Sequence, residues 1–214
     1  MKERFHEALA VDQKSSSDQF LIALLNLMKH KSFDSISISE LCQAAGLSRT
    51  TFYKFFRDKE ALLEYLKEDL ALGFVTFKKS LDTRNIPSEC VAYFHYFTFW
   101  YHVREWVDVL LRDGLWERIA MPDDHSLALL SQRSWEGYLS ENDQAVEMMQ
   151  HFIAAGCVQL VKWWGNNGYQ KTPVEMAELV VYTLSGNPLN AKKKELVSTT
   201  PLKHSHCNAY NRRF

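Results

Sequence analysis

The chain has 214 residues, 46% of them hydrophobic and 24% charged, and a net charge of −1 at pH 7. These values are ordinary for a folded protein of one or two domains, and they exclude a uniformly basic nucleic-acid-binding protein. A surface that binds DNA must therefore be local. With only 8 glycines and 5 prolines, the composition favours long helices over sandwiches or barrels.

The cysteines and the N-terminal segment indicate where the protein works. The four cysteines, at positions 42, 90, 157 and 207, form no Cys-x-x-Cys pair. This predicts reduced thiols in the cytoplasm rather than disulfides or a zinc cluster. Residues 1–17 contain no apolar segment of the kind found in a signal peptide, and no stretch reaches about 18 uninterrupted apolar residues. We therefore expect a cytoplasmic protein that does not enter a membrane.

Two capping patterns mark the first helices. Residues 1–15 are polar, and we predict that they are flexible. Ser16 and Gln19 have capping-box spacing at the start of a first helix of about 15 residues. Ser37 and Glu40 repeat that spacing at the start of a second helix. The capping patterns therefore predict two helices before residue 46.

A tight turn joins the second predicted helix to a third. Gly46 ends the second helix, because glycine adopts the left-handed conformation at least cost. Ser48 caps a short third helix, and Asp58 caps a fourth that runs to about Leu81. Two short helices joined by a glycine turn and preceded by another helix make a helix-turn-helix. The second helix of such a pair lies in the DNA major groove and reads bases with its N-terminal residues.

The third predicted helix has a packing face and a polar face. Phe52 and Phe56, four residues apart, hold it to the core, and the Tyr53 hydroxyl can reach a phosphate. Residues 49–59 carry four basic side chains and one acidic one, a local net charge of +3 that suits phosphate neutralisation. The residues left for DNA are Arg49, Thr50, Thr51 and Lys54.

The segment resembles the DNA-binding signature of TetR-type transcriptional regulators, T-[VI]-x-x-I-A-x-x-A-G-V-S-x-x-x-L-Y-x-x-F-x-x-K-E-x-L. Residues 37–62 read S-I-S-E-L-C-Q-A-A-G-L-S-R-T-T-F-Y-K-F-F-R-D-K-E-A-L. The departures are Ser37 for Thr, Cys42 for Ala and Phe52 for Leu. The match fixes more than ten positions without a gap and covers residues 16–66, under a third of the chain.

The resemblance implies an all-α homodimer that binds double-stranded DNA. A three-helix helix-turn-helix domain would occupy residues 16–60, and a helical effector-binding and dimerisation domain residues 61–187. In the family, the match to Tyr53 usually contacts a phosphate, the match to Lys59 supports the backbone from the start of the fourth helix, and the matches to Arg49, Thr50 and Lys54 vary with the operator. The predicted DNA-binding residues are Ser37, Ser48, Arg49, Thr50, Thr51, Tyr53, Lys54 and Lys59.

The rest of the chain keeps a helical pattern. A helix from Ser88 ends at Asp113–Gly114, and residues 121–124 mark a second boundary. Further predicted elements are a helix at 125–140, a long helix capped by Asn142 or Asp143 and ending near Gly165, a loop at 165–173, a last helix from Pro173 to Gly186, and a basic, disordered tail at 188–214.

Residues 92–106, AYFHYFTFWYHVREW, contain eight aromatic side chains. Two interpretations stay open. One is a buried core helix, since aromatics dominate cores; the other is the wall of an apolar ligand cavity with a few placed polar groups. The resemblance favours the cavity, because TetR-type effector pockets lie among the helices after the long connecting helix. The candidate residues for a small-molecule effector pocket are Phe74, Phe77, Tyr93, Phe97, Trp100, Tyr101, His102 and Trp106.

The last two predicted helices are amphipathic, and residues 154–156 (Ala-Ala-Gly) let another helix approach closely. In TetR-type regulators these helices pair with their copies in a four-helix dimer interface. Packing within one chain is the alternative. The candidate dimer-interface residues are Ala155, Val158, Trp163, Met176, Leu179 and Val180.

Residues 164–176, W-G-N-N-G-Y-Q-K-T-P-V-E-M, resemble a C-terminal type found in Firmicutes TetR-like regulators, including activators of dihydroxyacetone kinase operons. That branch includes activators that respond to a protein partner. An activator controlled by a protein co-regulator is therefore an alternative to a regulator controlled by a small molecule. A helical ligand-binding protein or enzyme with a vestigial helix-turn-helix is another.

The remaining patterns predict neither a metal site nor catalysis. His95 and His102 lie two turns apart on one helical face, too far to share a metal without other groups. His204, His206 and Cys207 lie in the basic tail, where a solvated histidine is the default. No nucleophile elbow, phosphate-binding loop, dinucleotide fingerprint or H-E-x-x-H motif occurs. We expect no catalytic residue, no metal and no cofactor.

Overall fold

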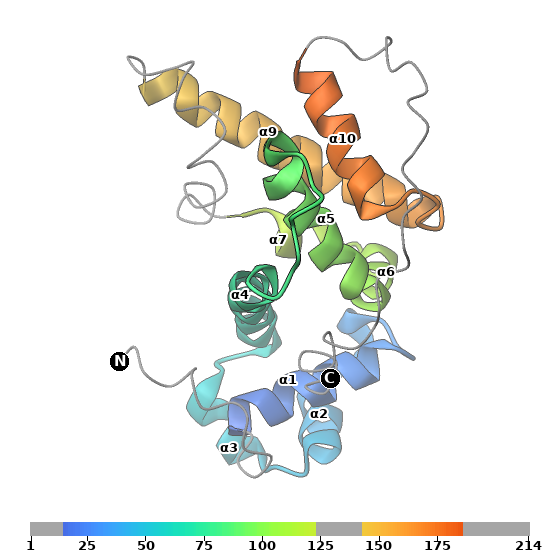
Figure 1. Cartoon of the computed structure of the whole chain (residues 1–214). Helices are drawn as coiled ribbons and strands as arrows, with labels where there is room; N and C mark the ends of the chain where they lie inside the picture. Colours follow the sequence, from blue (N-terminus) through green and yellow to red (C-terminus); the bar gives the residue numbers. More distant parts are fainter. Residues whose placement is uncertain (1–14, 123–142, 186–214) are drawn as a thin grey trace. The chain divides into compact units, whose positions relative to one another are not determined.

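The computed structural model describes residues 15–122 and 143–185, which are helical with short connecting turns (Figure 1). No strand occurs within these ranges, so the all-α prediction is confirmed there. The chain divides into two compact units between Leu66 and Lys67, inside helix α4 (Lys59–Lys78). This division falls six residues after the expected boundary at residue 60. The predicted helix at 125–140, Gly186 and the predicted tail lie outside the described residues.

The N-terminal unit contains the three helices of the helix-turn-helix and the start of α4. Its elements are α1 (Ser16–Met28), the short 3-10 helix η1 (Phe33–Ser35), α2 (Ile38–Ala45), α3 (Arg49–Phe55) and the first turns of α4. Phe20 is completely buried between these helices and meets the rings of Phe52 and Phe56 edge-on, with centroids 5.2 and 6.3 Å away. Aromatic packing thus fixes α3 against α1.

Local capping explains where these helices begin and end. Ser37 and Glu40 form the predicted capping box, and Gly46 ends α2 with φ of 67°, the left-handed conformation. The Asp58 carboxylate accepts from the backbone N–H of Ala61 at 2.8 Å at the start of α4. The prediction for α1 is wrong by one residue: the cap is Ser15, whose hydroxyl accepts from the N–H of Asp18.

The C-terminal unit contains the rest of α4 and five further described α-helices. They are α5 (Val91–His102, after the 3-10 helix η2, Ser88–Cys90), α6 (Arg104–Arg112), α7 (Trp116–Ala120), α9 (Asp143–Asn166) and α10 (Pro173–Leu184). Helix α10 packs along α5, whereas α6 and α7 pack against α9. Helix α4 ends at Lys78, three residues before the predicted Leu81.

The predicted single helix from Ser88 to Asp113 is interrupted. The buried Val103 leaves helical geometry, with φ of −100° and ψ of 23°, and α6 begins at the next residue. The break changes the direction of the chain so that Val107 and Leu110 of α6 reach the core. Helix α7 was not predicted. Its Trp116 is completely buried and donates from the indole N–H to the Val158 carbonyl at 3.0 Å, which ties α7 to α9.

Candidate DNA-binding interface and effector site

Helix α3 has the two faces expected of a reading helix. Phe52 is completely buried and Phe56 nearly so, whereas Tyr53 is 49% exposed and Phe55 51% exposed. Arg49, Thr50 and Lys54 are exposed on the polar side of the helix. Within the described residues, the Arg49 and Lys54 side chains make no hydrogen bond or ion pair, so both remain available for DNA.

The predicted hydroxyl residues already serve as caps. Ser48 accepts from the Thr51 N–H at 3.0 Å, and the two hydroxyl oxygens are 2.8 Å apart. Ser37 accepts from the Glu40 N–H at 3.2 Å, and its own hydroxyl contacts the Glu40 carboxylate at 3.0 Å. These bonds fix the first turns of α2 and α3, and they leave Thr50 as the hydroxyl on the open face.

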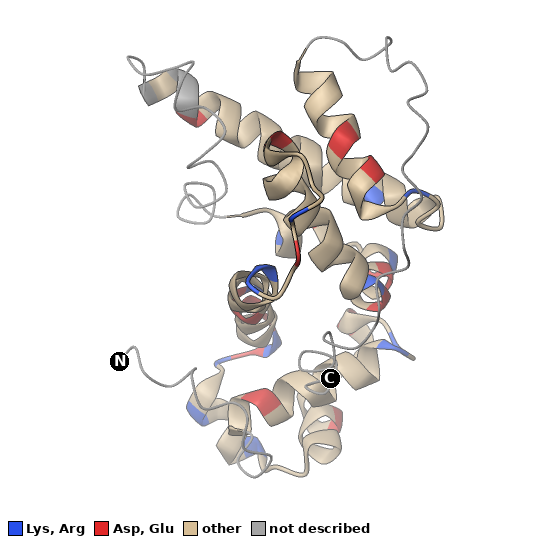
Figure 2. Ribbon diagram, in the orientation of Figure 1, with Lys and Arg blue, Asp and Glu red and all other residues tan. Residues whose placement is uncertain are grey.

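The local positive charge lies on α3 and the turn after it (Figure 2). Arg57 is highly exposed and pairs with the neighbouring Asp58 at 3.0 Å, an interaction that solvent screens strongly. Lys59, by contrast, is half-buried, and its ammonium donates to backbone carbonyls of residues 33–36. The side chain is therefore not the open phosphate contact that a basic patch suggests.

One exposed apolar residue of α3 was not predicted from the sequence. Phe55 presents half of its ring surface next to the reading face, and apolar side chains there can contact the methyl group of thymine. Helical spacing gave no clear signal for this exposure, because Phe55 is three residues after Phe52 and therefore lies at the edge of the packing face. The neighbouring aromatic residues also suggested that Phe55 is buried, since three phenylalanines close together are typical of a core.

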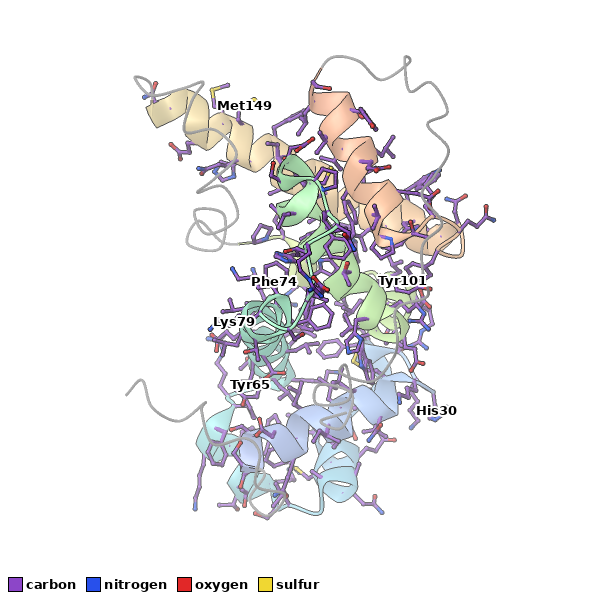
Figure 3. All side chains as sticks on the ribbon, viewed as in Figure 1. His30, Tyr65, Phe74, Lys79, Tyr101 and Met149 are labelled. Atoms are coloured by element: carbon purple, nitrogen blue, oxygen red, sulfur yellow. The ribbon has the colours of Figure 1, made fainter. Side chains whose placement is uncertain are left out.

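The candidate pocket residues fall on more than one side of α5. Phe74 and Phe77 of α4 contact the Phe99 ring, with centroids 5.4 and 5.7 Å apart, and Phe77 also stacks on His102 at 5.0 Å. Figure 3 labels Phe74 on α4 and Tyr101 on α5. The other contacts on α5 are Phe97 and Tyr101 with Trp164, and Trp100 with Trp116. The predicted residues therefore do not form one wall.

Two further candidates complete this picture. Burial, with smaller effects of Cys157 on α9 and of Cys90, raises the pKa of Tyr93 to about 12. Trp106 is half-buried on α6. Much of the aromatic run is thus core packing, and only Phe74, Phe77 and His102 are brought together between α4 and α5.

Buried polar atoms on α5 are the unusual feature of this region. The Nε2 atom of His95 and the hydroxyl of Thr98 are buried, and neither has a hydrogen-bond partner among the described residues. The Tyr96 hydroxyl, near Trp100, is also buried without a hydrogen bond of normal geometry. Burial first, and Lys78 second, lowers the pKa of His95, so the ring is neutral at pH 7. Unpaired buried polar atoms are costly, and a bound ligand is one explanation.

The candidate dimer residues separate into core and surface. Val158 and Met176 are completely buried within one chain, and Val180 is nearly so. These three side chains cannot contact a second copy, because α9 and α10 already bury them against their neighbours. Trp163 and Leu179 are exposed and Ala155 is half-buried. Additional exposed apolar side chains on the same two helices are Met148, Phe152 and Tyr182.

The described residues offer no arrangement suited to a metal, since no three His, Cys, Asp or Glu side chains gather there. Cys42, Cys90 and Cys157 are buried free thiols, and burial raises the pKa of Cys157 to about 12. Such a thiol is protonated and unreactive. His204, His206 and Cys207 are outside the described residues. None of the described helices has the length and apolarity needed to cross a membrane.

Comparisons with known proteins agree with this architecture. The profile of bacterial regulatory proteins of the tetR family matches residues 21–66, and that of a transcriptional regulator C-terminal region matches residues 124–186. No curated protein sequence matches the chain. Two solved structures are similar in fold: a dihydroxyacetone kinase operon activator, DhaS, and the fatty acid degradation regulator FadR from Bacillus halodurans.

These two similarities concern the fold alone, because the sequences are distant. DhaS is 15% identical with a TM-score of 0.53, over 80% of this chain and 94% of its own. FadR is 16% identical with a TM-score of 0.52, over 81% of this chain and 96% of its own. The family profile, by contrast, lies on the helix-turn-helix, where α3 presents its open basic face. The chain belongs to the TetR family and is a DNA-binding transcriptional regulator.

Proposed function

We propose that the protein binds a palindromic operator as a homodimer, with α3 of each copy in the major groove. The observation that carries this proposal is the open surface of α3: Arg49, Thr50 and Lys54 are exposed, while Phe52 is fully buried. In this arrangement Arg49 and Thr50, at the N-terminal end of α3, read base edges. Lys54 and the Tyr53 hydroxyl bind phosphates and set the orientation of the helix.

The exposed apolar side chains of α9 and α10 support the dimer. Met148, Phe152 and Trp163 recur at helical spacing along one side of α9, and Leu179 and Tyr182 are exposed on α10. Pairing of both helices with their copies buries these side chains. The two reading helices then have the fixed separation that a palindrome requires, about 34–36 Å for half-sites one helical turn apart.

A small-molecule effector that shifts this separation would control DNA affinity. The buried Nε2 of His95 and hydroxyl of Thr98 support such a site, because both lack partners among the described residues. His95, Thr98 and His102 share one face of α5, and the stacking of His102 on Phe77 directs that face toward α4. The effector best suited to it has an apolar body and at least one hydrogen-bonding group.

Control by a protein partner is the second candidate, and the exposed apolar side chains of α9 favour it. In this candidate, Met148 and Phe152, which are exposed on α9, stay outside the dimer interface and are covered by the partner. A reporter gene placed behind the selected operator separates the two modes. Activation that requires a second protein supports the partner, whereas a response to a small molecule alone supports the effector.

Selection of random duplex DNA on the purified protein tests the proposed reading function. We expect enrichment of one palindromic sequence, and loss of base preference at one position of each half-site in Arg49→Ala. Binding of the selected duplex across a salt series then separates phosphate contacts from base contacts. Salt-sensitive binding without any enriched sequence would contradict sequence-specific reading, and the helix-turn-helix would then be only an electrostatic surface.

A further inference from the structure

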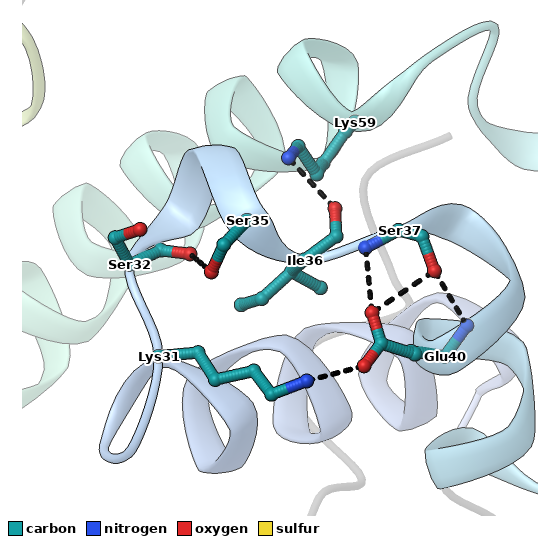
Figure 4. Close-up of polar contacts among 7 residues, drawn as sticks. All are labelled: Lys31, Ser32, Ser35, Ile36, Ser37, Glu40 and Lys59. Atoms are coloured by element: carbon teal, nitrogen blue, oxygen red, sulfur yellow. Dashed lines mark hydrogen bonds and ion pairs between the residues drawn. The ribbon is translucent and has the colours of Figure 1, made fainter.

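Lys59 stands at the first position of α4 and reaches back along the chain to the loop before α2. Its Nζ atom lies 2.5 Å from the carbonyl oxygen of Phe33, 2.8 Å from that of Ile36 and 3.2 Å from that of Asp34. Figure 4 shows the bond to Ile36. The Phe33 ring, itself buried, lies with its centroid 4.4 Å from the same nitrogen. Three carbonyl groups and one ring from a single short segment thus converge on one ammonium group.

The Lys59 ammonium group is fully hydrogen-bonded in this arrangement. A lysine side chain has three N–H donors, and three carbonyl oxygens occupy all of them. The carbonyls come from η1 and the extended residue after it, where the backbone does not continue into a helix. The aromatic face of Phe33 adds a cation–π contact. A phosphate oxygen would have to displace one of these partners before it could bind Lys59.

The segment that Lys59 holds leads directly into the helix-turn-helix. Ile36 precedes Ser37, the cap of α2, and Glu40 of the same capping box pairs with Lys31 on the other side of the loop (Figure 4). Helix α3 follows α2 after the Gly46 turn and is separated from Lys59 by only residues 56–58. The Lys59 bonds therefore close a ring formed by α2, α3 and the start of α4.

We infer that Lys59 is a positioning residue, which orients α2 and α3 for DNA by clamping residues 33–36 to the start of α4, and that it makes no phosphate contact itself. This inference rests on the proposed reading function of α3. It separates two basic residues that the sequence grouped together: Lys54 is open and contacts phosphate, whereas Lys59 acts within the protein.

The salt dependence of DNA binding distinguishes the two roles, with Lys59→Met compared against Lys54→Met. Methionine keeps most of the aliphatic stem and removes the charge. Each phosphate-binding cation contributes about 0.9 to the magnitude of the slope of log K against log salt, and a substitution in the proposed dimer removes two of them, a decrease of about 1.8. We expect that decrease in Lys54→Met, with an unchanged thermal midpoint. Lys59→Met should keep the wild-type slope and lower the thermal midpoint. It should also weaken binding roughly threefold to tenfold at every salt concentration, the effect of losing one net hydrogen bond.

Lys59→Arg provides a second test, because a planar guanidinium cannot direct its donors to three converging carbonyls. The clamp predicts that arginine fails to restore the wild-type midpoint or affinity, even though the charge is kept. A phosphate contact predicts that it restores both. A slope lowered in magnitude by about 1.8 in Lys59→Met, with an unchanged midpoint and rescue by arginine, would overturn the inference.

Nitrogen-15 NMR of lysine-labelled wild-type protein tests the clamp without DNA and without a variant that must fold. Three hydrogen bonds should protect the Lys59 ammonium from exchange with water, so its signal should be visible in the free protein and should shift little on addition of duplex. The open Lys54 ammonium should exchange rapidly when free. Rapid exchange at Lys59 would overturn the clamp. Failure to select any operator would count against sequence-specific reading and leave the NMR result untouched.

Discussion

At the scale of single residues, position on the helix decides whether a side chain of α3 packs or reads. Phe52 and Phe56 form one side of a ring cluster with Phe20, while Arg49 and Lys54 have no hydrogen-bond or ion-pair partner among the described residues. The cost of leaving two cations unpaired is small in water. In the proposed complex, the gain comes when phosphates or base edges approach Arg49 and Lys54, so we expect these residues to contribute to DNA binding rather than to folding.

Arg49→Ala should relax base choice without abolishing binding. Arginine donates in bidentate fashion to guanine, and loss of such a pair removes about 1–3 kcal/mol of discrimination at that base pair. Arg57→Ala is the matched control, since Arg57 is exposed beyond the end of α3 and pairs with Asp58. Competition assays with single-base operator variants measure both. Equal discrimination in wild type and Arg49→Ala would show that another residue of α3 reads that base.

The stability of the N-terminal unit should respond to acid through Glu40. The Lys31 ammonium first, and then the N–H and hydroxyl of Ser37, hold the pKa of Glu40 at about 2, below its usual 4.5. A lowered pKa contributes stability that is present above pH 4.5 and is lost as pH falls toward 2. The thermal midpoint of wild type should therefore fall more steeply over this range than that of Glu40→Gln. Parallel curves would mean that the Lys31–Glu40 pair has no net effect on stability.

Thr98→Val should remove the effector response without harming the free protein. The buried Thr98 hydroxyl has no partner among the described residues, and valine has nearly the same shape. Removing an unpaired buried hydroxyl should raise the free energy of unfolding by about 1 kcal/mol. Urea denaturation measures this, and an effector that stabilises wild type should stabilise Thr98→Val less. A less stable Thr98→Val protein would mean that the hydroxyl is already bonded, for instance to bound water.

At the scale of secondary-structure elements, caps and turns explain the helix-turn-helix, while packing explains the C-terminal unit. Helices α2 and α3 are too short to be stable alone, so their capping bonds and their contacts with α1 hold them. Helix α5 is apolar on nearly every side, which is expected of a helix surrounded by others. It contacts α4 through Phe99 and α9 through Phe97.

Gly46→Ala should weaken the turn that joins α2 to α3. Gly46 has φ of 67°, and a Cβ atom there would meet no neighbour within 4 Å. The cost is therefore backbone strain alone, about 1 kcal/mol after the entropy gain in the unfolded chain. Gly46→Asn should cost less, because asparagine tolerates this conformation. Thermal unfolding with operator titration checks both variants. An alanine variant as stable as wild type would show that the turn adopts another geometry.

At the scale of the whole molecule, the proposed reading of a palindrome requires a second copy, since one α3 can cover only half of such a site. The two described units each have their own core, and α4 belongs to both. Helix α4 is the described element that is continuous from the N-terminal unit into the unit that contains α5.

Leu179→Asp should convert the protein to a monomer. Leu179 is 39% exposed on α10, and a carboxylate there would be buried unpaired in the proposed four-helix interface. Leu72→Asp is the matched control, because Leu72 is 47% exposed on α4, away from α9 and α10 in the sequence. Sedimentation velocity measures the mass of each variant. A dimeric Leu179→Asp protein would place the interface elsewhere.

The helix-turn-helix could be predicted from the amino-acid sequence alone, because its signals are local. The Ser37–Glu40 capping box, the Ser48 cap, the glycine turn and the Phe52–Phe56 spacing involve residues within four positions of each other, and the structure has each of them, although the cap of α1 is one residue earlier than predicted. The partners of Lys59, by contrast, lie 23–26 residues away, so only the folded chain brings them together. Folding also sets the side of α5 that each aromatic faces, and the burial of Val158 and Met176. In a helix that is apolar on all sides, the sequence does not mark which side faces the core. The neighbouring helices alone therefore determine which side chains are covered and which stay open.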